Sequence, residues 1–412
     1  MSAAPGDFDG DGKMDLMTVS VKDDVKSVHI MWGQLTKLVC IEHLVTIPDI
    51  FSEPLVFDYN KDSVSDLLTV DKDGNRTVYV FPKHREAYHK EHLLTTKTNP
   101  LKAEHGNSFV DITGDGIADL VLTTSEGLEM YEGINSKESQ KQFKYLSTLQ
   151  WPLTDACNAD QCVGQPVWMD FSLQGFLHMV LPVCGDPQCA DSRLYLVPVS
   201  NLSRPSDHTT KCSEENCPWP EAWPPMSLDL GQMLFKPRPT DPAQSPLQLL
   251  TPRVGDVDLD GFPDLLMTLY NKSGDIDQQG EVQLLLNVPC GPDTGCHPYW
   301  RQFQLQPGYT AGLGNAVTGA FFDLYEDGKM DLLVVRQDDK GVYSMSAFTN
   351  TTQDSDAYFM KVIVLTGACY HDCDSHHSVP YGTNSGGQLV SYQSQRPGQE
   401  TFDSYQSVAV QV

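Results

Sequence analysis

Residues 256–265 read Asp-Val-Asp-Leu-Asp-Gly-Phe-Pro-Asp-Leu, and this pattern decides the fold because it recurs along the chain. Side-chain oxygens stand at positions 1, 3, 5 and 9 of the pattern, and glycine usually stands at position 6. A decayed copy keeps only the frame, with Asp170, Ser172, Gln174, Gly175 and His178. We number the six copies as loops 1 to 6, and they span residues 7–15, 58–66, 111–119, 170–178, 256–264 and 323–331.

Short apolar runs surround each loop. For loop 2 they are residues 54–57 before the loop, 67–70 after it and 78–81 beyond a polar turn. Runs of this length, rich in β-branched and aromatic residues and bounded by Gly, Asp and Asn, are typical of strands. About four strands per repeat, repeated six times, predict an all-β fold, a β-propeller over residues 1–366. A pair of β-sandwiches is the alternative, but it would give less regular repeats.

Two segments depart from the repeat. A proline-rich insertion near residues 204–252 carries Trp219 and Trp223, and its prolines exclude central strands and helix interiors. We interpret it as a surface loop that packs its own aromatic residues; a partner-binding loop with exposed Trp anchors is the alternative. Residues 367–412 no longer follow the repeat and are predicted to begin a second β domain.

The acidic loops predict metal binding. Carboxylates at alternate positions can surround one point, and oxygen donors without nitrogen or sulfur select Ca²⁺, with Mg²⁺ second. Loops 1 and 5 carry four carboxylates each and should bind the metal ion best. Tyr325 stands at position 3 of loop 6, which makes a metal site there doubtful, and loop 4 should hold no metal. An EF-hand is excluded, because position 12 is never Glu. The predicted ligands are Asp7, Asp9, Asp11, Asp15, Asp58, Asn60, Asp62, Asp66, Asp111, Thr113, Asp115, Asp119, Asp256, Asp258, Asp260, Asp264, Asp323, Asp327 and Asp331.

The metal sites could be regulatory or purely structural, and we favour a structural role. In a structural role the bound metals only brace the hairpins and carry no regulatory signal. Five separate loops without a shared bistable element are expected to stabilise the fold rather than switch it.

Ten of the eleven cysteines fall in close pairs, and only Cys40 stands alone. The spacing predicts local disulfides at Cys157–Cys162, Cys184–Cys189, Cys212–Cys217, Cys290–Cys296 and Cys369–Cys373, with Cys40 free. Four glycosylation sequons accompany them, at Asn75, Asn201, Asn271 and Asn350. Paired cysteines and sequons together favour the secretory route. Because the N-terminus does not read as a signal peptide, we treat the chain as a fragment of a longer protein.

The net charge and the sequence motifs exclude several classes of function. The chain has 28 basic and 55 acidic side chains, a net charge of −27, which argues against nucleic acid and anionic lipid as partners. It contains no zinc-protease, nucleophile-elbow or phosphate-loop motif. Cys369 and Cys373, with His376 and His377, could bind zinc, but their spacing favours a disulfide. We therefore predict a binding module rather than an enzyme; a secreted calcium-dependent hydrolase is the alternative.

The Asp-x-Asp-x-Asp-Gly-x-x-Asp-Leu repeats resemble the FG-GAP repeats of integrin α-subunit propellers. Residues 321–328, 281–290 and 356–365 carry the resemblance further, and it extends over nearly the whole chain. It implies a type I single-pass membrane glycoprotein with an extracellular propeller that acts in cell adhesion and in modulating T cells through protein binding. It also implies seven blades in the full-length protein, with a signal peptide, a membrane helix and one upstream repeat that are not visible here.

Overall fold

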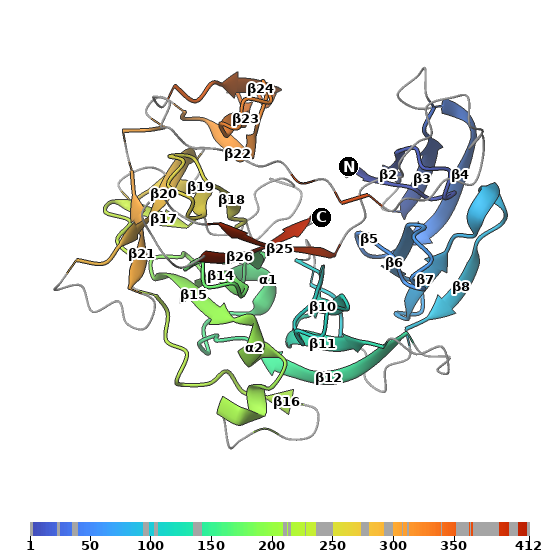
Figure 1. Cartoon of the computed structure of the whole chain (residues 1–412), viewed down its shortest axis with the longest axis horizontal. Helices are drawn as coiled ribbons and strands as arrows, with labels where there is room; N and C mark the ends of the chain where they lie inside the picture. Colours follow the sequence, from blue (N-terminus) through green and yellow to red (C-terminus); the bar gives the residue numbers. More distant parts are fainter. Residues whose placement is uncertain are drawn as a thin grey trace. The chain divides into compact units, whose positions relative to one another are not determined.

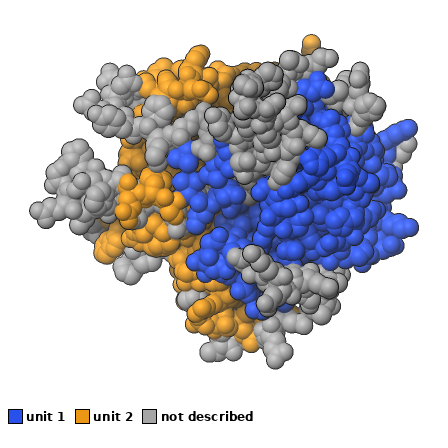
Figure 2. Space-filling model, turned by 45° about the vertical axis from the view of Figure 1, so that its right-hand side comes forward, with its two compact units in different colours: residues 1–148, 362–390, 408–412 blue, residues 149–361, 391–407 orange. Residues whose placement is uncertain are grey.

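The computed structural model describes residues 3–22, 25–34, 40–93, 99–102, 106–134, 142–208, 212, 216–226, 228–235, 250–272, 280–291, 300–306, 308–310, 313–338, 340–351, 362, 364–365, 387–394 and 403–409. Of residues 40–43, 208, 394 and 403–409 it describes the backbone alone. The chain forms two compact units (Figure 2). Unit 1 comprises residues 1–148, 362–390 and 408–412, and unit 2 comprises residues 149–361 and 391–407.

Unit 1 carries three antiparallel sheets whose strands pair in chain order (Figure 1). Blade 1 consists of β1 (Ala3–Gly6), β2 (Asp15–Lys22), β3 (Val25–Trp32) and β4 (Cys40–Ile50). Blade 2 consists of β5 (Leu55–Phe57), β6 (Asp66–Val70), β7 (Arg76–Val80) and β8 (His89–His92), with the 3₁₀ turn η1 (Lys83–Arg85) after β7. Blade 3 consists of β9 (Ser108–Val110), β10 (Asp119–Thr123), β11 (Gly127–Gly133) and β12 (Phe143–Gln150).

Unit 2 carries three further sheets. Blade 4 consists of β13 (Val167–Met169), β14 (His178–Cys184) and β15 (Ser192–Pro198). Blade 5 consists of β18 (Arg253–Gly255), β19 (Asp264–Asn271), β20 (Glu281–Pro289) and β21 (Arg301–Leu305), and β17 (Met233–Phe235) also pairs with β19. Blade 6 consists of β22 (Ala316–Phe322), β23 (Asp331–Gln337) and β24 (Tyr343–Phe348). The remaining elements are α1 (Ala159–Cys162), α2 (Val199–Leu202), η2 (Pro205–His208), β16 (Asn216–Cys217), β25 (Gln388–Ser394) and β26 (Asp403–Ala409).

The second strands of blades 2 and 5 are apolar on both faces because each lies between two neighbouring blades of its own unit. In β6 the side chains of Leu67 and Leu68 point to opposite faces, as successive residues of a strand must. Leu67 packs in a cluster with residues of blade 1, and Leu68 packs in a cluster with residues of blade 3. Blade 5 repeats the arrangement, since Leu265 packs toward blade 4 and Leu266 toward blade 6. Burial of an apolar side chain of this size contributes roughly 1.5–3 kcal/mol.

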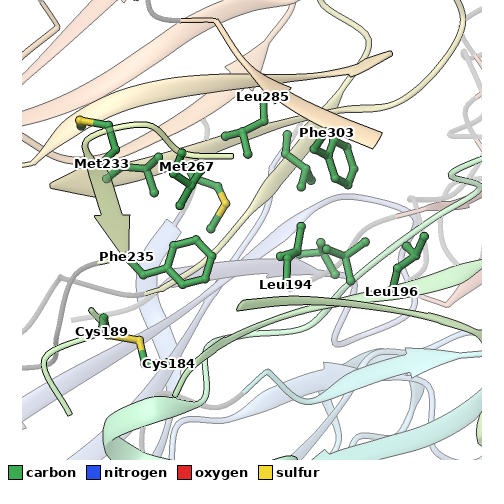
Figure 3. Close-up of a cluster of buried hydrophobic side chains, with 14 of the residues drawn as sticks. Cys184, Cys189, Leu194, Leu196, Met233, Phe235, Met267, Leu285 and Phe303 are labelled. Atoms are coloured by element: carbon green, nitrogen blue, oxygen red, sulfur yellow. A yellow bond between two sulfur atoms is a disulfide. The ribbon is translucent and has the colours of Figure 1, made fainter. Parts of the chain in front are cut away.

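The cluster between blades 4 and 5 also receives residues from the insertion (Figure 3). Phe235 of β17 is fully buried there, and its ring lies between Met267 and the disulfide of Cys184 with Cys189. Trp219 contacts Tyr195 of β15 at 5.1 Å and Trp223 at 5.6 Å between ring centroids, both edge-to-face. The described part of the insertion therefore packs its own aromatic residues, which agrees with the favoured interpretation.

The predicted fold class is confirmed: the chain is an all-β protein whose six small sheets form the blades of a β-propeller, and β25 and β26 pair in a further two-stranded sheet. Blades 1 and 2 have the four strands expected, and the sheets of blades 3 and 5 each hold a fifth strand, β16 and β17. Blades 4 and 6 show three strands in the described residues. The predicted domain boundary at residues 366 and 367 lies outside the described residues, as does most of the segment 367–412. The boundary, the second domain and the seventh blade stay predictions.

Candidate metal centre

All six loops share left-handed backbone at the same two positions, and each loop joins the first strand of a blade to its second. Positions 4 and 6 have positive φ in every copy; the pairs are Gly10 and Gly12, Lys61 and Ser63, Gly114 and Gly116, Leu173 and Gly175, Leu259 and Gly261, and Glu326 and Gly328. A residue other than glycine pays about 1–2 kcal/mol for this left-handed conformation. Loop 4 shares the conformation although it has lost most acids, so the turn does not need the full ligand set.

The aspartate at position 1 holds the turn together. In loop 1 Asp7 accepts hydrogen bonds from the backbone N–H groups of Asp11 at 3.1 Å and Gly12 at 2.9 Å. In loop 4 Asp170 accepts the same two bonds, from Gln174 at 3.1 Å and Gly175 at 2.8 Å. This explains why the decayed copy keeps its aspartate at position 1 and its fold.

The aspartate at position 9 joins three strands of its own blade. Asp15 accepts a hydrogen bond from the N–H of Phe8 at 2.8 Å and another from the N–H of Gly33, beyond β3, at 2.7 Å. Equivalent pairs of bonds reach the carboxylates of Asp66, Asp119, Asp264 and Asp331. In loop 4 the buried His178 occupies this position. The protein's own hydrogen bonds at this position therefore brace the blade, and bracing by a bound metal stays a prediction.

Three carboxylates converge in two of the loops. Oxygens of Asp7, Asp9 and Asp15 lie within 4.8 Å of one another in loop 1, and oxygens of Asp256, Asp258 and Asp260 do so in loop 5. These are the two loops whose four predicted ligands are all carboxylates. In the other loops of the described structure no three acidic, histidine or cysteine side chains come this close.

The other predicted ligands stand in weaker sets. In loop 2 the amide of Asn60 donates to Asp62 at 3.0 Å. In loop 3 the hydroxyl of Thr113 donates to Asp111 at 3.4 Å. In loop 6 Tyr325 is 68% exposed, so position 3 supplies no ligand there.

Burial and mutual repulsion act on the acids of loop 1. Burial raises the pKa of Asp7 to about 7 and the pKa of Asp15 to about 8. The charge of Asp9 adds to both shifts, whereas the backbone N–H groups of Gly12 and Gly33 oppose them. A carboxylate that is costly to ionise beside others is stabilised by a cation held between them.

Loop 5 shows the same electrostatics with one further feature. Burial raises the pKa of Asp256 to about 6 and the pKa of Asp264 to about 7. The Oδ1 atom of Asp256 is buried and has no hydrogen-bond partner. An anionic oxygen without a donor, beside Asp258 and Asp260, fits a hard cation such as Ca²⁺. The donor chemistry of loop 5 therefore suits the predicted ion.

Two arginines that form ion pairs with acids of the loops were not identified in the sequence analysis. Arg85 of η1 donates to Asp9 of loop 1, although 76 positions separate them. Arg301 of β21 lies 3.3 Å from the Oδ2 atom of Asp260 in loop 5. No local pattern announces either contact, because each arginine reaches its loop only after the strands have folded.

Three of the predicted disulfides are confirmed: Cys157–Cys162, Cys184–Cys189 and Cys212–Cys217. Cys290 is also disulfide-bonded. Its predicted partner Cys296, the pair Cys369 and Cys373, and the side chain of Cys40 lie outside the described part of the chain.

The four sequons differ in their surroundings. Asn75 is exposed, and its amide bonds Asp71 at 3.1 Å within the same turn. Asn271 is exposed at the end of β19, and Asn201 lies in α2. Asn350 is half-buried and donates its side-chain amide to the backbone oxygen of Val257 at 2.8 Å. Glycosylation stays a prediction at all four.

No family model matches the chain. Curated proteins are similar to the chain over most of its length. The human (Homo sapiens) T-cell immunomodulatory protein is 30% identical over 408 residues. The aligned residues cover 95% of this chain and 60% of the human protein. The chain is thus similar to the T-cell immunomodulatory proteins over most of its own length. The protein from Mus musculus is 30% identical over 95% of this chain, and protein linkin of Caenorhabditis elegans is 25% identical over 90% of it. The resemblance to the T-cell immunomodulatory protein, which residues 281–290, 321–328 and 356–365 carried, is confirmed. The resemblance of loops 1 to 6 to FG-GAP repeats stays a prediction.

The chain spans about 60% of the length of the T-cell immunomodulatory proteins that it matches. Among solved structures, the BP39L lectin of Burkholderia pseudomallei covers 95% of this chain with a TM-score of 0.46 at 9% identity, a likeness from which we draw nothing. Within the described residues, no helix has the length and apolar character to cross a membrane.

Proposed function

We propose that the chain is the extracellular, calcium-braced propeller of a cell-surface glycoprotein that binds protein partners in cell adhesion and in the modulation of T cells. The observation that carries the proposal is similarity over 95% of the chain to proteins named for T-cell immunomodulation, and over 90% to linkin. The disulfides at Cys157–Cys162, Cys184–Cys189 and Cys212–Cys217 support an oxidising, extracellular location.

A protein partner is the class that the charge supports. The net charge of −27 is unfavourable for phosphate backbones and for anionic lipid surfaces. The full-length protein would hold this propeller at the outer face of the plasma membrane through an anchor that is not visible here.

Calcium would be held first by loop 5, through Asp256, Asp258 and Asp260, and also by loop 1. When bound, it supplies positive charge among carboxylates that otherwise repel one another. If each site has a dissociation constant of about 0.1 mM and extracellular Ca²⁺ is about 1 mM, binding contributes roughly 1.4 kcal/mol per site. Two to four sites would contribute roughly 3–6 kcal/mol, a large part of ordinary domain stability.

The stabilising role is tested by thermal unfolding of the chain in calcium and in chelator at fixed ionic strength. We expect a clear loss of melting temperature in chelator and a partial loss for Asp258→Ala in calcium. Gln174→Ala in loop 4 is the matched control and should change almost nothing. Equal melting temperatures in calcium and chelator would remove the calcium part of the proposal.

The binding role is tested on cells. The chain, secreted from mammalian cells as a fluorescent fusion, is added to purified T cells in 1 mM Ca²⁺, and bound protein is measured by flow cytometry. We expect saturable binding that unlabelled chain displaces and that protease treatment of the cells abolishes. Binding that survives protease treatment, or no saturable binding by folded protein, would contradict a protein partner.

A further inference from the structure

Loops 1 and 5 carry the same acids but bring different ones together. Both have aspartate at positions 1, 3, 5 and 9. In loop 5 the position-5 acid, Asp260, belongs to the converging group, whereas in loop 1 its counterpart Asp11 does not, and Asp15 takes part instead. The same sequence pattern of aspartates therefore gives two different arrangements of carboxylates in space.

Two cations account for the position of Asp11. Its Oδ2 atom lies 2.9 Å from Nζ of Lys13 and 3.6 Å from Nη2 of Arg85. The Nε–H of Arg85 donates to Oδ2 of Asp9. The side chains of Asp9 and Asp11 are only 2% and 5% exposed, so these contacts are well shielded on the acidic side. A guanidinium thus bridges positions 3 and 5 of loop 1.

The position of Arg85 is fixed by its surroundings. It ends η1, where His84 and Arg85 both have positive φ, at 69° and 58°. The N–H of His84 donates to the backbone oxygen of Asp9 at 2.8 Å, and the Cζ atom of Arg85 lies 4.9 Å from the ring centroid of Trp32. Two consecutive strained residues persist only where neighbouring contacts determine them. A hydrogen bond, a cation–π contact and an ion pair do so here.

The arginine at loop 5 is held differently. Arg301 donates to the side-chain and backbone oxygens of Asn287 and lies over the ring of Phe262 at 3.2 Å. Its ion pair with Asp260, at 3.3 Å, is longer, and Asp260 is the most exposed acid of the converging group. Most of its hydrogen-bonding capacity is directed away from the loop.

We propose that Arg85 is a tethered competitor for the cation site of loop 1. A divalent cation that takes up Asp9 and Asp11 must displace the guanidinium, so loop 1 binds the cation more weakly than loop 5. Because Arg85 belongs to blade 2 and loop 1 to blade 1, binding there also changes the contact between these two blades. This inference rests on the calcium role proposed above.

The test uses the whole chain and Tb³⁺, whose luminescence is sensitised by nearby aromatic side chains. Asp9→Asn assigns the signal of loop 1, and Asp258→Asn assigns that of loop 5. Arg85→Gln removes the charge, and Arg85→Lys retains it. We expect Arg85→Gln to lower the dissociation constant of loop 1 by about two- to fivefold, the effect of one partly exposed ion pair, and Arg85→Lys to stay near the parent value. Thermal unfolding in chelator confirms that each variant is folded.

The outcomes separate the two proposals. An unchanged or weaker loop 1 in Arg85→Gln, with normal binding in loop 5, would overturn the role of Arg85 and leave the calcium role standing. No Tb³⁺ or Ca²⁺ binding in either loop of the parent chain would overturn both. A second readout is the fluorescence emission of Trp32. Ca²⁺ should shift this emission in the parent chain and not in Arg85→Gln. A shift of equal size in the two proteins would count against displacement of the guanidinium.

Discussion

Asn287 donates its side-chain amide to the backbone oxygen of Phe171, 2.9 Å away and 116 positions earlier in the chain. Phe171 is position 2 of loop 4, so this hydrogen bond joins blade 5 to blade 4. Asn350 repeats the contact one blade later, with Val257 at position 2 of loop 5. Each asparagine also donates its backbone N–H to the position-9 aspartate of its own blade, Asp264 at 2.9 Å or Asp331 at 2.7 Å. The two asparagines therefore clamp consecutive blades of unit 2.

The first prediction concerns this clamp. Asn287→Ala removes the donor to the backbone oxygens of Phe171 and Pro263 and the acceptor of Arg301. We expect the free energy of unfolding to fall by about 2–3 kcal/mol, because three hydrogen bonds are lost at about 1 kcal/mol each. Urea unfolding measures it. Asn75→Ala, at an exposed turn, should change stability by less than about 0.5 kcal/mol. Equal effects of the two substitutions would show that the clamp adds nothing.

The second prediction concerns glycan occupancy. N-glycosylation attaches to the amide nitrogen, which in Asn350 is half-buried and bonded to Val257, whereas Asn75 is exposed in a turn. We expect glycopeptide mapping of the chain from mammalian cells to find Asn75 occupied and Asn350 largely unmodified. High occupancy at Asn350 in correctly folded protein would mean that its inter-blade hydrogen bond is dispensable.

The repeat made the fold predictable because position and residue type recur together. Aspartate stands at positions 1 and 9 in every loop but loop 4, and glycine stands at position 6 in every loop but loop 2. The flanking apolar runs supply the strands. The same regularity predicted loops 1 and 5 as those with converging carboxylates. Loop 4 was predicted to lack a metal, but its unchanged backbone, maintained by Asp170, could not be foreseen from its missing acids.

Contacts between blades escaped the sequence because they join residues far apart in the chain. The buried ion pair of Arg76 with Glu129 links β7 to β11, and Tyr131 donates to the same carboxylate at 2.8 Å. Arg85 reaches loop 1 in the same way. Neither arginine belongs to a motif, and in the sequence each stands in an ordinary polar stretch. Only the stacking of blades brings such residues together.

The third prediction uses the one loop without glycine at position 6. Ser63 has φ of 70°, in the left-handed region where a side chain is unfavourable. Ser63→Gly should raise the free energy of unfolding by up to about 1 kcal/mol, since relief of strain exceeds the entropy that glycine adds to the unfolded chain. Gly116→Ser, the reverse change in loop 3, should lower it by a similar amount. Thermal unfolding of both variants in chelator measures the effects without interference from metal, and a destabilised Ser63→Gly would contradict the argument.

The fourth prediction concerns pH. His178 is fully buried at position 9 of loop 4, and burial lowers its pKa from 6.5 to about 4. The unfolded chain therefore binds a proton at this residue between about pH 6.5 and 4 while the folded chain does not, so the stability contributed by the neutral ring is lost as the pH falls through this window. The loss should reach about 3 kcal/mol near pH 4.

Comparison with a variant isolates this residue from the raised carboxylates of the other loops. Those carboxylates act with the opposite sign, because a group whose folded pKa is raised loses stability as the pH rises. They are present in both proteins and cancel in the difference. Urea unfolding of the parent chain and His178→Gln at pH 7 and pH 4.5 should show the parent losing about 2–3 kcal/mol more than the variant. His89→Gln, at an exposed histidine, should track the parent chain. If His178→Gln also tracks it, the imidazole is protonated in the folded protein, and position 9 of loop 4 must then have access to water that its burial does not suggest.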